Sequence, residues 1–147
     1  MVQRFYFPLT VNRYESGSWG ATEGDGRIAC KYRGEIENAL DVYNAGEDMS
    51  QYFYGSETAK AKIVGAEWHF ENADGCLFGR VDIFLTEPLN TMETEEVKWW
   101  ITGQNSDGLG EGFEQQSIRV GYDIIEIGFW NPSDDYRVMT EEEFRNR

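Results

Sequence analysis

The feature that most constrains the fold is a pair of stretches, residues 63–71 and 76–86, in which apolar and polar side chains alternate strictly. This alternation is typical of β-strands with one buried face. The segment between them, Asn72-Ala73-Asp74-Gly75, is rich in turn-forming residues and predicts a four-residue turn. We therefore expect a β-hairpin that places Glu71 opposite Cys76.

In this register one face of the hairpin is apolar and the other is largely polar. The apolar face is expected to hold the cross-strand pairs Val64/Ile83, Ala66/Val81, Trp68/Gly79 and Phe70/Leu77. The other face is expected to hold Gly65/Asp82, Glu67/Arg80 and His69/Phe78. A slip of one residue would bury charged side chains, which favours this register. The apolar face should pack on a core, with Trp68 across Gly79, and the polar face should meet water or a partner.

Shorter elements surround the hairpin. Aromatic and β-branched runs predict strands over residues 2–11, 27–33, 117–120 and 123–130. A glycine-rich loop is expected between the first two, over residues 12–26. Apolar residues at helical spacing predict a short helix over 35–44 and a helical turn over 48–54.

Two capping boxes predict the starts of further helices. Asn90 with Glu93 begins a helix that should end at Gly103, and Thr140 with Glu143 begins a terminal one. The fold class is therefore α+β. Residues 1–147 are predicted to form a single domain with a mainly antiparallel sheet, a central hairpin at about 63–86 and two to three short helices.

The net charge is −14, from 13 Lys and Arg against 27 Asp and Glu. Such a field repels phosphates and anionic lipids, so direct binding to nucleic acid or to a membrane surface is disfavoured. It attracts proteins with a basic surface. No signal peptide and no apolar run of membrane-spanning length is visible, and Cys30 and Cys76 do not form a CxxC motif. We expect a cytoplasmic protein with reduced thiols.

Residues 101–116 combine four glycines with Asp107, Glu111 and Glu114. The segment superficially resembles a calcium loop, but Leu109 and Gln116 occupy the positions that need oxygen ligands. It also lacks the Gly-Lys-Ser/Thr ending of a phosphate-binding loop. His69 is the only histidine, which excludes metal sites that need two imidazoles. We expect no cofactor and no resident metal, and we assign no catalytic residue.

The segment LTEPLN…EEVKWWITGQNSDGLGEGFEQQSI (residues 85–118) resembles an uncharacterised family of small bacterial proteins. The family is found on prophages and integrative mobile elements of gut-type Gram-positive bacteria, and it shares the pattern Thr-Gly-Gln-x-Ser-Asp-Gly-x-Gly-Glu-Gly-Phe-Glu-Gln. Here Asn90-Thr91 stands where the family has Thr-Pro, and Leu109 replaces its usual Trp. The resemblance implies cargo of a mobile element, where small acidic proteins often antagonise host defences.

The leading hypothesis is a non-enzymatic acidic inhibitor that masks a basic surface of a host defence or nucleic-acid-binding protein. It would act by nucleic-acid mimicry, as an anti-CRISPR or antirestriction protein does. The predicted partner-binding residues are Glu93, Glu95, Glu96, Asp107, Glu111, Glu114, Asp134 and Asp135, with Glu141, Glu142 and Glu143 as further candidates.

Two alternatives stay open. A small-molecule module, such as a sponge for a nucleotide signal, would use the basic residues of the N-terminal part, Arg4, Arg13, Lys31 and Arg33. An enzyme is the third possibility. Its most accessible version would depend on His69, and paired carboxylates cannot be singled out among so many.

Overall fold

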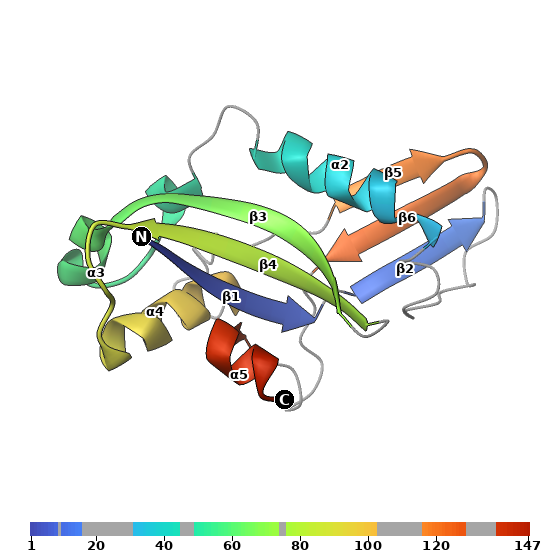
Figure 1. Ribbon diagram of the computed structural model, residues 1–147. Coiled ribbons are helices and arrows are strands. Elements are labelled where there is room, and N and C mark those ends of the chain that lie inside the picture. Colours follow the sequence, from blue (N-terminus) through green and yellow to red (C-terminus); the bar gives the residue numbers. More distant parts are fainter. Residues whose placement is uncertain (9, 16–30, 45–48, 74–75, 103–115, 129–137) are drawn as a thin grey trace.

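The computed structural model describes residues 1–8, 10–15, 31–44, 49–73, 76–102, 116–128 and 138–147 (Figure 1). Runs of strands are separated by short helices along the chain. In order they are β1 (Val2–Pro8), β2 (Thr10–Glu15), α2 (Arg33–Asn44), the 3-10 helix η1 (Met49–Tyr52), α3 (Glu57–Lys62), β3 (Ile63–Ala73), β4 (Cys76–Leu85), α4 (Thr91–Thr102), β5 (Gln116–Val120), β6 (Asp123–Gly128), β7 (Met139–Thr140) and α5 (Glu141–Arg145).

The described strands form two antiparallel sheets. The larger has the order β3-β4-β1-β7 and the smaller the order β2-β6-β5. The predicted α+β class and the mainly antiparallel pairing are confirmed. The predicted strand over residues 2–11 is instead two strands, because β1 ends at Pro8 and β2 joins the smaller sheet. Proline lacks the N–H that a continuing strand would need.

The central hairpin is confirmed, but its predicted register is wrong by two residues. Ala73 pairs with Cys76 and Phe70 pairs with Gly79, so only Asp74 and Gly75 lie between the paired positions. An Asp-Gly pair favours a two-residue connection over the four-residue turn expected from the sequence. Because the shift is an even number of residues, the side chains from Gly65 onward keep their predicted faces.

A β-bulge at the start of the hairpin changes the position of one residue. The register shifts between Ile63 and Gly65, and the intervening Val64 is 58% exposed. Val64 was expected on the apolar face. A bulge inserts one unpaired residue into a strand and so turns that side chain away from the alternating pattern.

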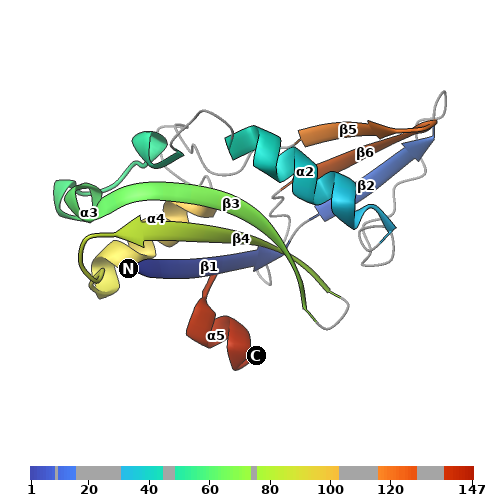
Figure 2. The same ribbon diagram turned by 45° about the horizontal axis from the view of Figure 1, so that its top comes forward.

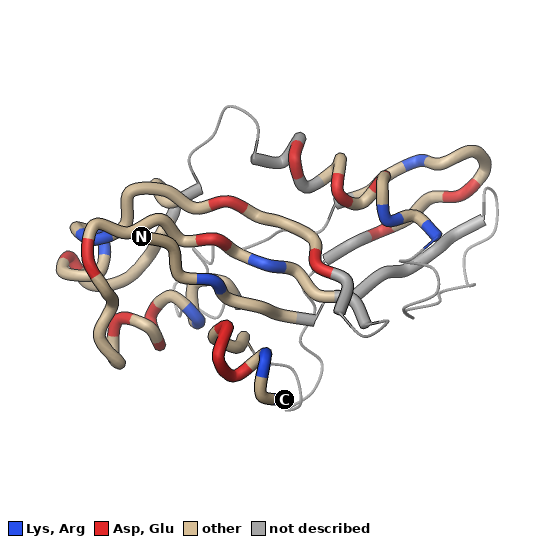
Figure 3. Tube along the Cα trace, viewed as in Figure 1, with Lys and Arg blue, Asp and Glu red and all other residues tan. Residues whose placement is uncertain are grey.

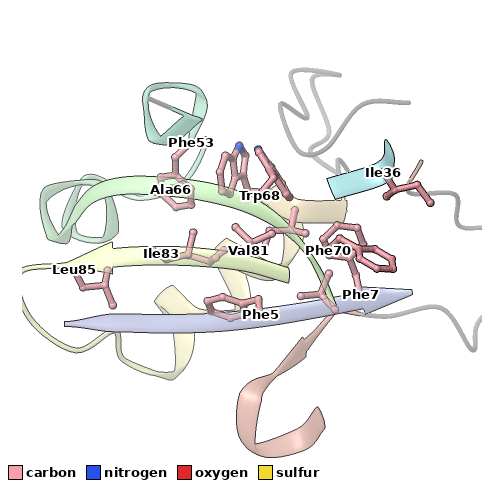
Figure 4. Close-up of a cluster of buried hydrophobic side chains, with 14 of the residues drawn as sticks. Phe5, Phe7, Ile36, Phe53, Ala66, Trp68, Phe70, Val81, Ile83 and Leu85 are labelled. Atoms are coloured by element: carbon pink, nitrogen blue, oxygen red, sulfur yellow. The ribbon is translucent and has the colours of Figure 1, made fainter. Parts of the chain in front are cut away.

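The apolar face of the larger sheet packs in the main hydrophobic core (Figure 4). Trp68 lies at its centre, and its ring is 5.7 Å from that of Trp100 of α4. Ile36 of α2 and Ile125 of β6 belong to the same cluster, so the core joins both sheets and the two longest helices. The core members from the hairpin and β1 are Phe5, Phe7, Ala66, Trp68, Phe70, Val81, Ile83 and Leu85.

The opposite face of this sheet is partly covered by α5, which lies on the other side from α2 (Figure 2). Phe144 stacks on Tyr6 with ring centroids 3.9 Å apart and meets the edge of Phe78 at 4.7 Å. These residues form a second, smaller core. The polar face predicted for the hairpin is therefore partly closed by the end of the chain.

Two further expectations are corrected in the first half of the chain. Residues 12–15, expected in a loop, belong to β2. Lys31 is helical and Arg33 begins α2, where the end of a strand was expected. The rest of the expected loop over 12–26 and of the expected strand over 27–33, residues 16–30, lies outside the described residues. Helix α3 was not predicted.

The helices over 35–44 and after Asn90 and Thr140, and the strands near 117–120 and 123–130, are confirmed with shifted ends. Among the described residues, no helix has the length and apolar character needed to cross a bilayer.

Candidate functional site

An open groove of about 490 Å³ lies between α4, α5 and the beginning of β1. Helix α4 contributes Glu95 and Lys98, and β1 contributes Arg4. The first turn of α5 contributes three consecutive carboxylates, Glu141, Glu142 and Glu143. Four carboxylates against two cations leave this lining with a net charge of −2.

Both helices that form the groove begin at the capping boxes predicted from the sequence. The Asn90 side chain accepts a hydrogen bond from the Glu93 N–H at 2.8 Å, and the Asn90 N–H donates to the Glu93 carboxylate at 2.9 Å. At α5, the Thr140 hydroxyl oxygen accepts from the Glu143 N–H at 3.3 Å. These bonds satisfy N–H groups that a helix start leaves without partners.

Ion pairs hold the walls of the groove together. Lys98 donates to the Glu143 carboxylate at 2.9 Å and lies 3.4 Å from Glu95, while Arg4 lies 3.6 Å from Glu141. The Lys98 hydrogen bond lowers the pKa of Glu143 below its ordinary value, so this carboxylate stays ionised at neutral pH. Glu142 is exposed and makes no ion pair within the part of the chain that the structure describes.

The predicted partner-binding residues do not all belong to this surface. Glu95 lines the groove. Glu96 is half-buried and accepts hydrogen bonds from the Ser56 hydroxyl at 2.7 Å and the Ser56 N–H at 3.3 Å, which orients the start of α3. The remaining predicted residues of this kind, except Glu93, lie outside the described residues; they are Asp107, Glu111, Glu114, Asp134 and Asp135.

Glu93 was predicted to contact a partner, and the structure corrects this. Its side chain is completely buried, and one oxygen accepts from both the Asn90 N–H and the Lys62 ammonium, the latter at 2.7 Å. The Asn90 hydrogen bond and then the Lys62 bond lower the pKa of Glu93 below its ordinary value. Glu93 therefore joins α3 to α4 and does not face solvent.

Replacement of Glu93 by glutamine is expected to lower the free energy of unfolding at neutral pH. It should also make that free energy less sensitive to acidification. A carboxyl whose pKa is lowered by folding contributes stability above its unfolded pKa, near the ordinary 4.5, and loses that contribution as pH falls through the folded value. In urea denaturation, the deficit of Glu93→Gln should be large at pH 7 and should shrink below about pH 4.5. The exposed control Glu87→Gln should stay within about 0.5 kcal/mol of wild type. A Glu93→Gln deficit independent of pH would contradict this account.

The residues proposed for a small-molecule site do not form one cluster. Arg4 lies on the polar face of the larger sheet, 3.5 Å from Asp82. Arg33 lies at the start of α2, over the ring of Phe70 on the other face, and pairs with Glu37. Lys31 lies over the Tyr32 ring, 5.0 Å from its centroid. The backbone of Arg13 is in β2, and its side chain lies outside the described ones. The expected basic pocket is therefore not assembled.

The polar face of the larger sheet holds a cluster that sequence reasoning missed. The Nε2 atom of His69 lies 3.1 Å from a Glu67 oxygen and 3.5 Å from an Asp82 oxygen. Within the described residues, this is the group of three His, Cys, Asp or Glu side chains whose ligand atoms come close enough to hold one metal ion. The expected register put His69 opposite Phe78 and Glu67 opposite Arg80. The observed register brings Glu67 opposite Asp82 and so creates the cluster.

In the larger sheet β3 carries acidic positions and β1 a basic one, while β4 between them carries both (Figure 3). Asp82 is 7% exposed and pairs with Arg80 at 2.9 Å, and Arg80 also pairs with Glu71 at 2.9 Å. Carboxylates on this face are thus largely balanced by arginines, whereas the groove keeps an excess of negative charge.

Comparisons of the chain with protein-family models, curated proteins and solved structures found no match.

Proposed function

We propose that this chain is a non-enzymatic, acidic protein-binding inhibitor that masks a basic surface of another protein. The observation that carries the proposal is the groove between α4 and α5. It gathers Glu95 with Glu141, Glu142 and Glu143 on one concave surface, although the two helices are far apart in the sequence. A lysine or arginine of a partner can contact carboxylates from both walls of this groove.

The electrostatics of the groove support a cationic partner rather than an anionic one. Lys98 and Arg4 each already contact a glutamate of the lining, so they hold carboxylates in place rather than presenting free positive charge. Individual exposed ion pairs are weak, but several carboxylates on one surface accelerate association with a basic protein and make it salt-sensitive. The overall charge of −14 extends the same attraction to longer range.

The resemblance of residues 85–118 to mobile-element proteins supports a host defence or nucleic-acid-binding protein as the target. In this proposal the chain acts in the bacterial cytoplasm and carboxylates imitate a phosphate backbone in a basic groove of its partner. The proposal gives the groove, rather than the whole acidic surface, the central role.

The proposal is tested with a fluorescein-labelled oligoarginine peptide as a cationic probe, measured by fluorescence anisotropy. The double variant Glu95→Gln/Glu142→Gln should bind the peptide roughly two- to thirty-fold more weakly, at about 0.2–1 kcal/mol for each exposed charge. Wild-type affinity should also fall steeply between about 0.01 and 0.15 M salt, because the screening length shortens from roughly 30 to 8 Å.

The matched control is Glu35→Gln/Asp41→Asn, which removes the same charge from exposed positions of α2, a helix that contributes no residue to the lining of the groove. It should change the affinity by less than about twofold. An equal loss in both double variants would show that binding follows net charge alone and would contradict a role for the groove.

A further inference from the structure

We propose that Glu67, His69 and Asp82 form a binding site for one divalent first-row transition-metal ion, with Zn²⁺ as the representative. The three side chains come from the central hairpin. Glu67 is directly opposite Asp82, and His69 follows two residues later on the same face of β3. Backbone pairing between β3 and β4 fixes the spacing of these positions without any ion.

The distances between the donor atoms suit a single small cation. Zinc binds imidazole nitrogen and carboxylate oxygen at about 2.0–2.2 Å, so two ligands at a tetrahedral angle lie ~3.4 Å apart. The His69 nitrogen is 3.1 Å from the Glu67 oxygen and 3.5 Å from the Asp82 oxygen, and all three atoms lie within 4.8 Å of one another. The Glu67 side chain is 52% exposed, so its rotation can close the longest separation.

Neighbouring groups orient the buried ligand. The Oδ1 atom of Asp82 accepts from Arg80 Nε at 2.9 Å and lies 3.5 Å from Arg4 Nε, while Oδ2 is the oxygen that faces His69. Hydrogen bonds that hold a ligating carboxylate raise the precision of a metal site. Arg80 also lies 3.3 Å from Oδ2, and a bound ion would have to share this oxygen with it.

The charges around the cluster permit a cation despite the nearby arginines. Glu71 pairs with both Arg80 and Arg145, and Glu141 pairs with Arg4. Counted with Glu67 and Asp82, the carboxylates of this connected network outnumber the guanidinium groups by one. The surplus negative charge lies at the outer edge of the cluster, where Glu67 and His69 reach solvent and water can complete the coordination.

The donor set selects the class of ion. One imidazole and two carboxylates suit zinc, cobalt or manganese, whereas calcium and magnesium favour sites built from oxygen alone. A single histidine is sufficient for this arrangement. None of the three ligands lines the groove, although the groove residues Arg4 and Glu141 belong to the charge network around the site. The proposed inhibitory function does not require the site.

The test exploits the fact that His69 is the only histidine of the chain. In the ¹⁵N-labelled full chain, with any polyhistidine tag removed, one set of imidazole resonances reports the site during titration with ZnCl₂. We expect these resonances to shift saturably. Glu67→Gln should weaken the binding by at least about tenfold, and the exposed control Glu57→Gln should leave it unchanged.

Glu67→Gln is chosen because Glu67 is exposed, so its loss should not prevent folding. Imidazole resonances that do not move at about 1 mM Zn²⁺ would overturn the proposal, since the affinity would then be too low for a built site. Equal Zn²⁺ affinity in wild type and Glu67→Gln would also overturn it. A failure here leaves the inhibitory function untouched, because peptide binding requires no metal.

Discussion

Replacement of Trp68 by alanine is expected to lower the free energy of unfolding by about 3–5 kcal/mol. Trp68 is 1% exposed, and its ring meets the edge of Phe7 at 6.0 Å and lies 5.7 Å from Trp100. It therefore fills the space between the larger sheet and α4, and its removal leaves a cavity that neither side can close. Urea denaturation followed by circular dichroism measures the loss without depending on tryptophan fluorescence.

The control for this experiment is Val64→Ala in the same strand. Val64 is 58% exposed because of the bulge, so its truncation should change stability by no more than about 0.5 kcal/mol. A Val64→Ala loss as large as that of Trp68→Ala would show that Val64 is buried, as simple alternation predicts, and would contradict the observed start of the hairpin.

Replacement of Gly79 by alanine is expected to cost about 1–3 kcal/mol, although alanine normally suits a strand better than glycine. A β-carbon at this position would lie 2.2 Å from Cζ of Phe7, far inside van der Waals contact. Phe7 pairs with Gly79 across β1 and β4 and is itself 1% exposed against Trp68. The buried Phe7 ring is packed against Trp68 and cannot simply move aside, so the added methyl group must displace packed atoms.

A double-mutant cycle with Phe7→Leu isolates this clash. The smaller side chain makes room for the methyl group, so the double variant should be more stable than the sum of the two single losses predicts. Gly65→Ala serves as the control, since its nearest side-chain neighbour, Phe84 Cδ2, would be 3.4 Å away. If the losses in the cycle are additive, the destabilisation by Gly79→Ala does not come from a clash with Phe7, and this account is contradicted.

Much of the hairpin could be predicted from its sequence, and its register shows where prediction fails. Alternation assigns Trp68 and Phe70 to the buried face correctly, because that assignment depends only on the period of two. A slip of two residues leaves the same side chains buried, so the hydrophobic pattern cannot detect it. The Asp74-Gly75 pair was the signal that distinguishes the two registers.

For the groove, the sequence predicts where its two helices begin but not that they lie next to each other. The capping boxes at Asn90 and Thr140 identify where α4 and α5 begin, since capping depends on neighbouring residues alone. The apposition of these helices depends on the pairing of β7 with β1, which joins the two ends of the chain. No local pattern reports that contact. The burial of Glu93 was missed for the same reason, because it requires Lys62 from the unpredicted α3.

The most direct test of the central claim is a map of where a cationic segment binds. Amide chemical shifts of the ¹⁵N-labelled chain are recorded during titration with the oligoarginine peptide. The account predicts the largest changes in residues 91–98 of α4, in residues 140–143 around the start of α5, and at Arg4. Changes spread over all acidic surfaces, or centred on α2 with Glu35 and Asp41, would contradict the groove as the site that a basic partner occupies.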